Sequence, residues 1–333
     1  MRKPTMEDVA RRAGVSRALV SLALSGSPKV SEQSMKAVLE ATDELGYRPN
    51  LMARTLASRR AMTIGVLLDD LHNPFYADVA DGLLAAATEA GYRVLFTAGL
   101  RHGDTQKVAV DTLLQLHVDG IVLVSPRFGA VEIEQRARHV PFVIVGEPLK
   151  AGVVDTVNVD EREAVRGVLE YLVSIGHTDI LHIDGGRGAA SVVRKRAYEA
   201  SMAALGLEHR TRVVAGEFTE SAGYEAARLL AACRPLPTAI FAANDLIAAG
   251  VLDGLEEAGV RVPDDVSVVG FDNTLYSKLG RLSLTTVDQP REEMGRVAVR
   301  TLLGRLDGAS AGAQHVLGSR LIVRGSTAPP RAD

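Results

Sequence analysis

The sequence has 333 residues, enough for two or three domains with sizeable apolar cores. Apolar residues make up 47% and charged residues 24% of the chain, and no segment is long and apolar enough for a membrane span or a secretory signal, so we expect a globular cytoplasmic protein. The single cysteine, Cys233, excludes an internal disulfide and a cysteine-based zinc site, and we expect it to be a buried, inert thiol.

The net charge of −3 conceals a difference between the two ends of the chain. Residues 1–60 contain 11 Lys and Arg against 6 Asp and Glu, whereas the remainder contains 27 basic against 35 acidic residues. A basic segment on an acidic body suggests a polyanionic partner for that segment alone. Charge by itself leaves a merely solvated basic surface as an equal alternative.

The first two predicted helices are short and joined by a tight turn. Thr5, followed by Asp8 three residues later, is a helix N-cap signature. Gly14 stands where a turn between two helices needs a residue that tolerates positive φ. Ser16 can then cap a second helix over residues 17–24.

The second predicted helix has two distinct sides, because helical spacing directs Val15, Val20 and Leu24 inward. A third amphipathic helix follows over residues 32–45, with Ser31 as its cap. Three such helices with a glycine turn fit a helix-turn-helix, whose second helix enters the major groove of DNA. A small helical bundle used only for packing is the alternative. The outward side of the second helix carries Arg17, Ala18, Ser21, Leu22 and Ser25.

Longer strings in this segment point to one protein family. They are Met6-Glu-Asp-Val-Ala-Arg-Arg-Ala-Gly-Val-Ser16, Leu45-Gly-Tyr-Arg-Pro-Asn50 and Ala53-Arg-Thr-Leu56-Ala. The chain closely resembles the LacI/GalR family of repressors, and the resemblance extends beyond this segment. It implies a helix-turn-helix DNA-binding domain over residues 1–48. The residues implied at the DNA are Thr5, Ser16, Arg17, Ala18, Ser21, Leu22, Ser31, Tyr47, Asn50, Ala53, Arg54 and Leu56.

Residues 49–60 match the hinge helix and linker of that family, a helix that orders only on operator DNA. By the resemblance, Leu56 is the apolar wedge that each subunit inserts into the minor groove, with Ala53 and Arg54 beside it. Opening a base step in this way costs about a few kcal/mol, which the contacts to a bent duplex offset. The resemblance thus predicts how the protein bends its operator.

The residues that would read bases depart from the family pattern. Where the family commonly has Thr-Val-Ser-Arg, this chain has Leu19-Val20-Ser21-Leu22, and Ser25 replaces a frequent Asn. Arg17 remains as the one side chain able to make a bidentate guanine contact, whereas Ala18 and Leu22 offer only apolar contact. We therefore expect an operator half-site that is read differently from common family operators.

From residue 61 onward, short β-branched runs alternate with helical stretches. Near-continuous apolar strands of this kind indicate parallel sheets covered by helices on both faces. Two sets of runs suggest two similar α/β lobes behind the all-α headpiece. The runs are residues 63–68, 92–97, 120–124 and 142–145, then 180–183, 213–216, 239–242 and 266–270.

Polar residues gather directly after these predicted strands, at Asp69-Asp70, Asp184, Asn244-Asp245 and Asp272-Asn273. Open α/β sheets bind ligands at the carboxyl ends of their parallel strands. Asn244 and Asp272 form the strongest pair, since an amide and a carboxylate suit a polyhydroxylated ligand. A helix N-cap is the alternative role for each residue, and we expect Asp245 to be the cap and Asn244 the ligand group.

The family resemblance implies a two-lobed body like the type I periplasmic binding proteins, over residues 61–333. Its chain would cross between lobes near Asp160, Gln289 and Leu321, so that ligand closure can rotate one lobe against the other. The implied lobes are an N-lobe of about residues 61–160 and 290–320 and a C-lobe of about residues 161–289 and 321–333.

The same resemblance implies an effector site between the lobes. Ala197 replaces a glycine of the family motif that carries Arg194, and Gly146 stands where several relatives carry an Asp, so one usual hydrogen bond to the ligand is missing. The residues implied at the effector are Phe75, Tyr76, Asp104, Arg194, Asn244, Asp272 and Gln289.

The resemblance as a whole implies a homodimeric repressor on a pseudo-palindromic double-stranded operator, controlled by a small-molecule effector. Sugars and sugar derivatives are the usual effectors, and purines and nucleosides the minority. A solute-binding protein of a transporter is the alternative, disfavoured by the headpiece and by the lack of a signal peptide. No nucleophile-base pair, phosphate-binding loop or metal motif suggests an enzyme or a cofactor. The C-terminus lacks an apolar heptad, so we expect a dimer without a tetramerising coiled coil. The lack of a membrane span leads us to expect no membrane partner.

Overall fold

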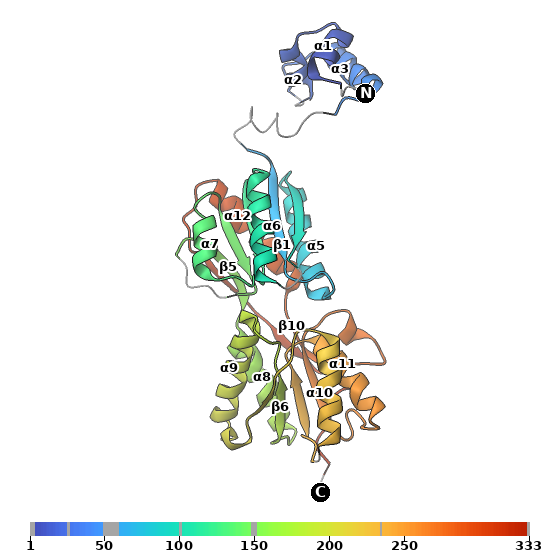
Figure 1. Cartoon of the computed structure of the whole chain (residues 1–333), viewed down its shortest axis with the longest axis vertical. Coiled ribbons are helices and arrows are strands. Elements are labelled where there is room, and N and C mark those ends of the chain that lie inside the picture. The colour runs from blue at the N-terminus through green and yellow to red at the C-terminus, as the bar shows by residue number, and fades with distance from the viewer. Residues whose placement is uncertain are drawn as a thin grey trace. The chain divides into compact units, whose positions relative to one another are not determined.

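The computed structural model describes residues 4–24, 27–48, 60–99, 102–147, 152–233 and 235–331. The chain divides into two compact units, Met1–Ala61 and Met62–Asp333, which we call the headpiece and the body (Figure 1). In these described ranges, no helix is long and apolar enough to cross a membrane.

The described headpiece residues form the expected helices α1 (Met6–Ala13), α2 (Arg17–Leu24) and α3 (Glu32–Leu45). At the start of α1, Thr5 and Asp8 form a reciprocal capping box, which satisfies two backbone N–H groups at once. Gly14 ends α1 in the left-handed region with φ 68°, where a side chain would be strained. Local capping and turn signals therefore determine where these helices begin and end.

A small apolar core holds the three headpiece helices together. Val9, Val20 and Val38, one from each helix, are fully buried. The inward side predicted for the second helix is confirmed, since Val20 is fully buried and Val15 and Leu24 pack against the same core; Ala23 is a further buried residue of that side.

The N-lobe of the body is a six-stranded sheet in the order β11-β5-β4-β3-β1-β2, and all its pairings are parallel. Its strands are β1 (Thr63–Leu68), β2 (Arg93–Ala98), β3 (Gly120–Val124), β4 (Phe142–Val145), β5 (Asp155–Val159) and β11 (Gln314–Leu317). Its helices are α5 (Pro74–Glu89), α6 (Gly103–Gln115), α7 (Ala130–Arg136) and α12 (Arg291–Leu306).

The C-lobe is a second six-stranded sheet, in the order β12-β10-β9-β8-β6-β7. Its strands are β6 (Ile180–Ile183), β7 (Arg212–Val214), β8 (Ala239–Ala242), β9 (Ser267–Asp272), β10 (Thr285–Asp288) and β12 (Arg320–Ile322). Its helices are α8 (Glu161–Ser174), α9 (Ala189–Ala204), α10 (Glu220–Ala232) and α11 (Asp245–Glu257), with 3₁₀ turns at Glu208–Arg210 and Tyr276–Lys278. The predicted fold class is confirmed, although β12 pairs with β10 in the antiparallel direction.

Alternation along each strand builds an apolar core on both faces of each sheet. In β3, Val122 and Val124 pack toward α5 and α12, whereas Ile121 and Leu123 pack toward α6 and α7. Burial on both faces explains why the strands read as continuous apolar runs. The C-lobe repeats this arrangement, with α10 and α11 over one face of its sheet and α8 and α9 over the other (Figure 1).

Helices α5 and α12 approach each other closely because each contributes a glycine to the contact. A Cβ built on Gly82 would lie 1.9 Å from the carbonyl oxygen of Glu292, and one on Gly295 would lie 2.2 Å from that of Val79. Neither position has room for a side chain. This contact fixes α12, and with it the chain segment that arrives from β10, against the N-lobe.

Three connections join the lobes. The chain passes from β5 to α8 at Asp160, from β10 to α12 at Gln289-Pro290, and from β11 to β12 at Gly318-Ser319. The third crossing lies a few residues before its expected position near Leu321, because a short strand of the C-lobe sheet already contains Leu321.

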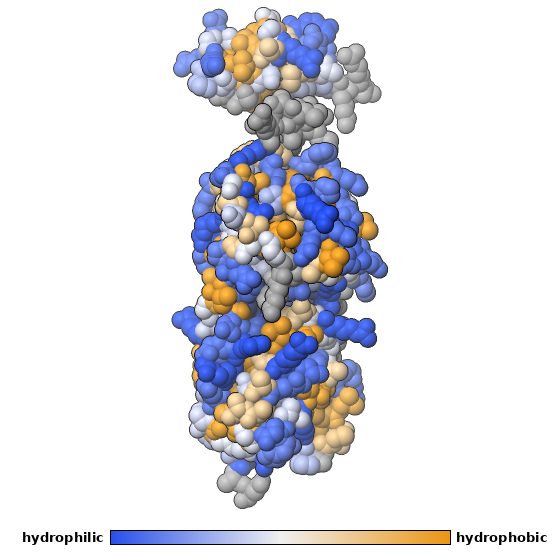
Figure 2. All heavy atoms as spheres, turned by 90° about the vertical axis from the view of Figure 1, so that its left-hand side faces the viewer, coloured by the Kyte–Doolittle hydropathy of each residue, from blue (hydrophilic) through white to orange (hydrophobic). Residues whose placement is uncertain are grey.

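The surface of the body is mainly polar on the side that Figure 2 shows, with apolar side chains scattered among hydrophilic ones. The expectation of a buried thiol is wrong, because Cys233 is exposed. It follows the last residue of α10, where the helix has already left the core.

Candidate functional site

Helix α2 presents the outward side predicted for DNA contact. Arg17, Ala18, Ser21 and Leu22 are all exposed, and Leu22 keeps 41% of its surface accessible. Val20 and Ala23 on the other side of the helix are buried. The amphipathic spacing of this short helix therefore leaves one cation, one hydroxyl and two apolar groups available together.

The hydroxyl residues predicted at the DNA already serve the headpiece as caps. The side chains of Thr5, Ser16 and Ser31 accept hydrogen bonds from the backbone N–H groups of Asp8, Leu19 and Ser34, at 3.3, 3.2 and 3.3 Å. Tyr47 is partly buried against the headpiece core. Of the remaining predicted residues, Ser25, Asn50, Ala53, Arg54, Leu56 and the hinge over residues 49–59 lie outside the described part of the chain.

A cleft, which we call the cavity, lies between the two lobes of the body, and the space of about 610 Å³ that its walls surround is partly open to solvent. Its lining comes from the carboxyl ends of β1, β3, β4, β9 and β10 and from the starts of α5, α8, α9 and α11. The lining residues are Asp69, Asn73, Phe75, Tyr76, Ser125, Pro126, Arg127, Gly146, Glu147, Glu161, Gly188, Ala189, Ala190, Arg194, Phe218, Asn244, Asp272 and Gln289.

On the N-lobe side, Asp69 is the centre of a buried polar cluster. Arg127 Nε donates to both of its carboxylate oxygens at 2.9 Å, and Gln106 Nε2 donates at 2.8 Å. The Tyr76 hydroxyl donates a longer bond of 3.4 Å to the same carboxylate. Burial raises the pKa of Asp69, although the Arg127 guanidinium opposes that shift. The cluster positions Tyr76 and Arg127 at the cavity wall.

On the C-lobe side, Arg194 is held as a buried cation. Its Nη2 and Nε donate to the two oxygens of Glu161 at 2.6 and 2.8 Å, and its Nη1 donates to the carbonyl of Ala243. The guanidinium carbon lies 3.6 Å from the centre of the Phe271 ring. A guanidinium that forks to a carboxylate and stacks on a ring has one orientation.

Asn244, and not Asp245, caps the helix that follows β8. Asn244 is the N-cap of α11, since its Oδ1 accepts from the backbone N–H of Ile247 at 2.9 Å. Asp245 is instead a buried acceptor that holds Thr274 and Thr286, and burial raises the pKa of its carboxyl. The correction has a structural reason, because Asp245 points back into the end of the sheet rather than at the free N–H groups.

Capping uses only the oxygen of the Asn244 amide. Its Nδ2 is buried, lines the cavity and has no hydrogen-bond partner. A buried donor without a partner costs about 1–3 kcal/mol. Asn244 therefore combines the two roles that the sequence treated as alternatives, and it offers a donor to a ligand.

Asp272 and Gln289 form the acceptor side of the same wall. Gln289 Nε2 donates to Asp272 Oδ1 at 2.7 Å, and both side chains are buried. Burial raises the pKa of Asp272, against the opposing influence of Arg194. The backbone at Asp272 has φ 114°, a strained value for a residue with a side chain. Strain at a cavity wall is typical of a binding residue held by its surroundings.

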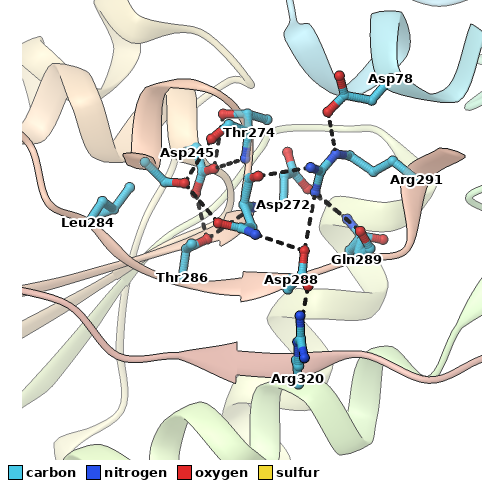
Figure 3. Close-up of polar contacts among 12 residues, drawn as sticks. Asp78, Asp245, Asp272, Thr274, Leu284, Thr286, Asp288, Gln289, Arg291 and Arg320 are labelled. Atoms are coloured by element: carbon cyan, nitrogen blue, oxygen red, sulfur yellow. Dashed lines mark hydrogen bonds and ion pairs between the residues drawn. The ribbon is translucent and has the colours of Figure 1, made fainter. Parts of the chain in front are cut away.

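Arg291 connects this wall to the N-lobe, as Figure 3 shows. Its Nε donates to Asp78 of α5 at 2.7 Å, and its Nη2 donates to the carbonyl of Asn273, next to Asp272, at 2.8 Å. Its Nη1 donates to the carbonyl of Gln289 at 3.2 Å. The buried side chain of Arg291 thus contacts both lobes, and its C-lobe contact is to the residue next to Asp272.

Some predicted polar residues are not in the cavity. Asp104 lies on the exposed surface of α6, where it pairs with Lys107 at 2.7 Å. Asp184 accepts from the backbone N–H groups of Gly186 and Gly216, each at 3.0 Å, and so shapes a turn. Asp184 directly follows β6 and Asp104 lies in the first turn of α6. Each carboxylate, however, binds groups of its own lobe and does not line the cavity.

Several cavity residues were missed in the sequence. Arg127 and Glu147 follow β3 and β4, so the rule of strand carboxyl ends could have found them. Glu161 could not be found in this way, because β5 before it was not predicted as a strand. The backbone at position 146 has φ 82°, a conformation that favours glycine, and this explains why Gly146 occupies the position.

Both the headpiece and the body are similar to known protein families. Residues 5–50 match the model of bacterial regulatory proteins of the lacI family, and residues 169–327 match that of the periplasmic binding protein-like domain. The HTH-type transcriptional regulator CelR of Thermobifida fusca is 36% identical over 338 residues, which cover 98% of this chain and 98% of that protein.

Two solved structures extend the comparison to the fold. A lac repressor dimer bound to operator and the anti-inducer ONPF has a TM-score of 0.88 and 25% identity, covering 98% of this chain and 100% of that one. A complex of CelR with cellobiose has a TM-score of 0.73 and 34% identity, covering 97% and 99%.

Proposed function

The chain belongs to the LacI family of DNA-binding transcriptional regulators, and we propose that it is a cytoplasmic repressor whose operator affinity is set by a sugar or sugar derivative bound in the body. Its relatives include a repressor seen as a dimer on operator and a regulator seen with cellobiose. We propose the same assembly here, a homodimer on a pseudo-palindromic operator.

Residues 1–48 of the headpiece supply the DNA-binding part of this proposal. Arg17 is the side chain that can fork to a guanine, and the neighbouring Ala18 and Leu22 contact thymine methyl groups. The hydroxyls of Ser16, Ser21 and Ser31 donate to phosphates, which positions the helix without reading sequence. Residues 49–60 form the hinge, with Asn50, Ala53, Arg54 and Leu56 at the minor groove.

The observation that carries the effector assignment is the set of groups converging on the cavity between the lobes. An unpartnered amide donor of Asn244, the carboxyl of Asp272 and the fixed guanidinium of Arg194 line one wall. Phe75 and Tyr76 line the cavity from the N-lobe, edge to face at 5.3 Å between ring centres. Rings beside hydrogen-bonding groups of both kinds suit the apolar faces and hydroxyls of a sugar.

Closure of the lobes on the effector is the proposed means of control. An effector that binds one arrangement of the lobes better than the other shifts the balance between them, and equal affinity would shift nothing. Arg291 and Gln289 lie on a lobe crossing and touch Asp272 or its neighbour, so ligand contacts at Asp272 reach the N-lobe directly.

A binding experiment with the full chain tests the proposal. Selection from a random duplex library gives the operator, and fluorescence anisotropy at several salt concentrations gives its affinity. We expect log K to fall steeply with log salt, as phosphate contacts require. A thermal-shift screen of sugars, sugar phosphates and nucleosides then identifies the effector. The absence of sequence-selective binding, or of any stabilising sugar, would refute the corresponding half of the proposal.

A further inference from the structure

Glu147, directly after β4, is a carboxyl group that the contacts described so far leave unused. It lines the cavity from the N-lobe side, opposite the wall formed by Asp272. Its Oε2 atom is buried and has no hydrogen-bond partner. Burial raises the pKa of this carboxyl to about 7, because water no longer solvates the charge. Glu147 Oε2 therefore has no hydrogen-bond donor within the protein, and a ligand could supply one.

The charges around the cavity do not balance. Each of its two cations is neutralised by a carboxylate, Arg127 by Asp69 at 2.9 Å and Arg194 by Glu161 at 2.6 Å. Among the described residues that line the cavity, no lysine or histidine adds a third cation. Asp272 and Glu147 remain as carboxyl groups beyond these pairs, so the cavity has an excess of acidic groups.

Two buried polar atoms of the described lining residues have no hydrogen-bond partner, and together they fit a ligand that both accepts and donates. Asn244 Nδ2 needs an acceptor and Glu147 Oε2 needs a donor. A hydroxyl group can meet either need. A phosphate or carboxylate on the ligand could accept from Asn244, but an ionised anion has no donor for Glu147 Oε2 and would lie in the same cavity as the Glu147 carboxyl, which is mainly ionised at pH 7.5.

We propose that Glu147 is a specificity-determining residue that accepts a hydrogen bond from the effector and makes the cavity select uncharged hydroxylated ligands over their phosphorylated or acidic counterparts. The inference rests on the proposed effector function of this cavity and adds the charge class of the ligand. Juxtaposed like charges cost enough in a buried site to give at least about a tenfold difference in affinity.

Matched ligand pairs test this selectivity with the full chain, by thermal shift and calorimetric titration at pH 7.5. The probes are glucose and glucose 6-phosphate, ribose and ribose 5-phosphate, galactose and galacturonate, and adenosine and adenosine monophosphate. We expect every ligand that binds to be the uncharged member of its pair, with its anionic counterpart at least about tenfold weaker. An anion that binds as tightly as its parent would overturn the inference and leave the effector function intact. Failure of every sugar, charged or not, would instead refute the sugar assignment.

Two variants that each remove one negative charge distinguish a specific effect of Glu147 from the effect of the net charge of the protein. In Glu147→Gln the discrimination between the members of a binding pair should shrink severalfold, because the like charge is gone while the size is kept. The control Glu199→Gln removes one negative charge from an exposed position of α9 and should discriminate as the wild type does. Equal discrimination by wild type and Glu147→Gln would overturn the assignment of this residue.

Discussion

The outward side of α2 and the cavity of the body differ in what their polar groups do before any partner arrives. On α2, Arg17 and Ser21 are exposed, and the helix folds through contacts on its other side. In the cavity, Arg194 and Arg127 are held by buried carboxylates that also maintain the structure. The comparison teaches that the exposed Arg17 and Ser21 of α2 can change at little cost to folding, whereas the buried Arg194 and Arg127 of the cavity cannot.

Removal of a buried cation gives the largest expected effect. Arg194→Ala leaves the Glu161 carboxylate buried without its partner, and breaking a buried pair in this way costs about 3–5 kcal/mol. Urea unfolding of the body measures the loss. The matched control Arg196→Ala, at an exposed position of the same helix, should change stability by less than about 0.5 kcal/mol. Equal losses for the two variants would remove the distinction between the regions.

Arg17 provides the opposite case in the headpiece. Arg17→Ala should leave the unfolding transition unchanged but weaken operator binding by about 1–3 kcal/mol, the usual value of a bidentate guanine contact. Arg17→Lys keeps the charge and loses the fork, so it should recover salt-dependent binding without the base preference. Bind-and-select experiments on all three proteins check this. An unchanged half-site after Arg17→Ala would show that another residue reads the base.

Asn244 lies between these extremes, since it both caps α11 and faces the cavity. Asn244→Ala should destabilise the body by about 1 kcal/mol, whereas Asn244→Ser keeps a capping oxygen and should cost only a few tenths. Both variants lose the free Nδ2 donor and should bind the effector more weakly. Parallel unfolding and calorimetric titrations separate the two roles. Normal effector affinity in Asn244→Ser would exclude Nδ2 from ligand binding.

The smallest expected effect is a pH dependence of stability. Burial raises the pKa of Glu147 from 4.5 to about 7, so between these values the folded chain holds a proton that the unfolded chain has released. The contribution of this group to stability is greatest below about pH 4.5 and falls as the pH rises toward 7. Glu147→Gln should therefore gain stability over the wild type at pH 6 relative to pH 5, by about 1 kcal/mol. Urea unfolding of both proteins at each pH measures this difference. If the free energy of unfolding changed with pH by the same amount in the wild type and in Glu147→Gln, the raised pKa of Glu147 would be contradicted.

The same comparison explains how much the sequence could predict. The limits of α2 and α3 and the strands β1, β3, β4, β6 and β8 follow from local spacing and turn residues, and they were predicted residue for residue. The strands β5, β10, β11 and β12 were missed. β5 and β10 carry polar residues such as Asp155 and Asp288, and β11 and β12 are short strands at the sheet edges.

The site divides in the same way. Asp272, Asn244 and Gln289 were found because they stand at strand ends or match a family position. The ion pairs that shape the cavity join residues 58 and 33 positions apart, Asp69 with Arg127 and Glu161 with Arg194. Pairings at such separations leave no periodic signal in the sequence. The role of Asp245 as a buried acceptor also depends on Thr274 and Thr286, which only the fold brings near.

The central claim, that the ligand bound in the body controls DNA binding by the headpiece, has one direct test. Anisotropy of the selected operator duplex is measured with and without the ligand found by thermal shift, for the wild type and for Asp272→Asn. The account predicts that saturating ligand changes the operator affinity of the wild type by at least about fivefold. It also predicts that Asp272→Asn binds operator normally but no longer responds at that ligand concentration. An operator affinity that stays constant while the ligand demonstrably fills the cavity would contradict the account.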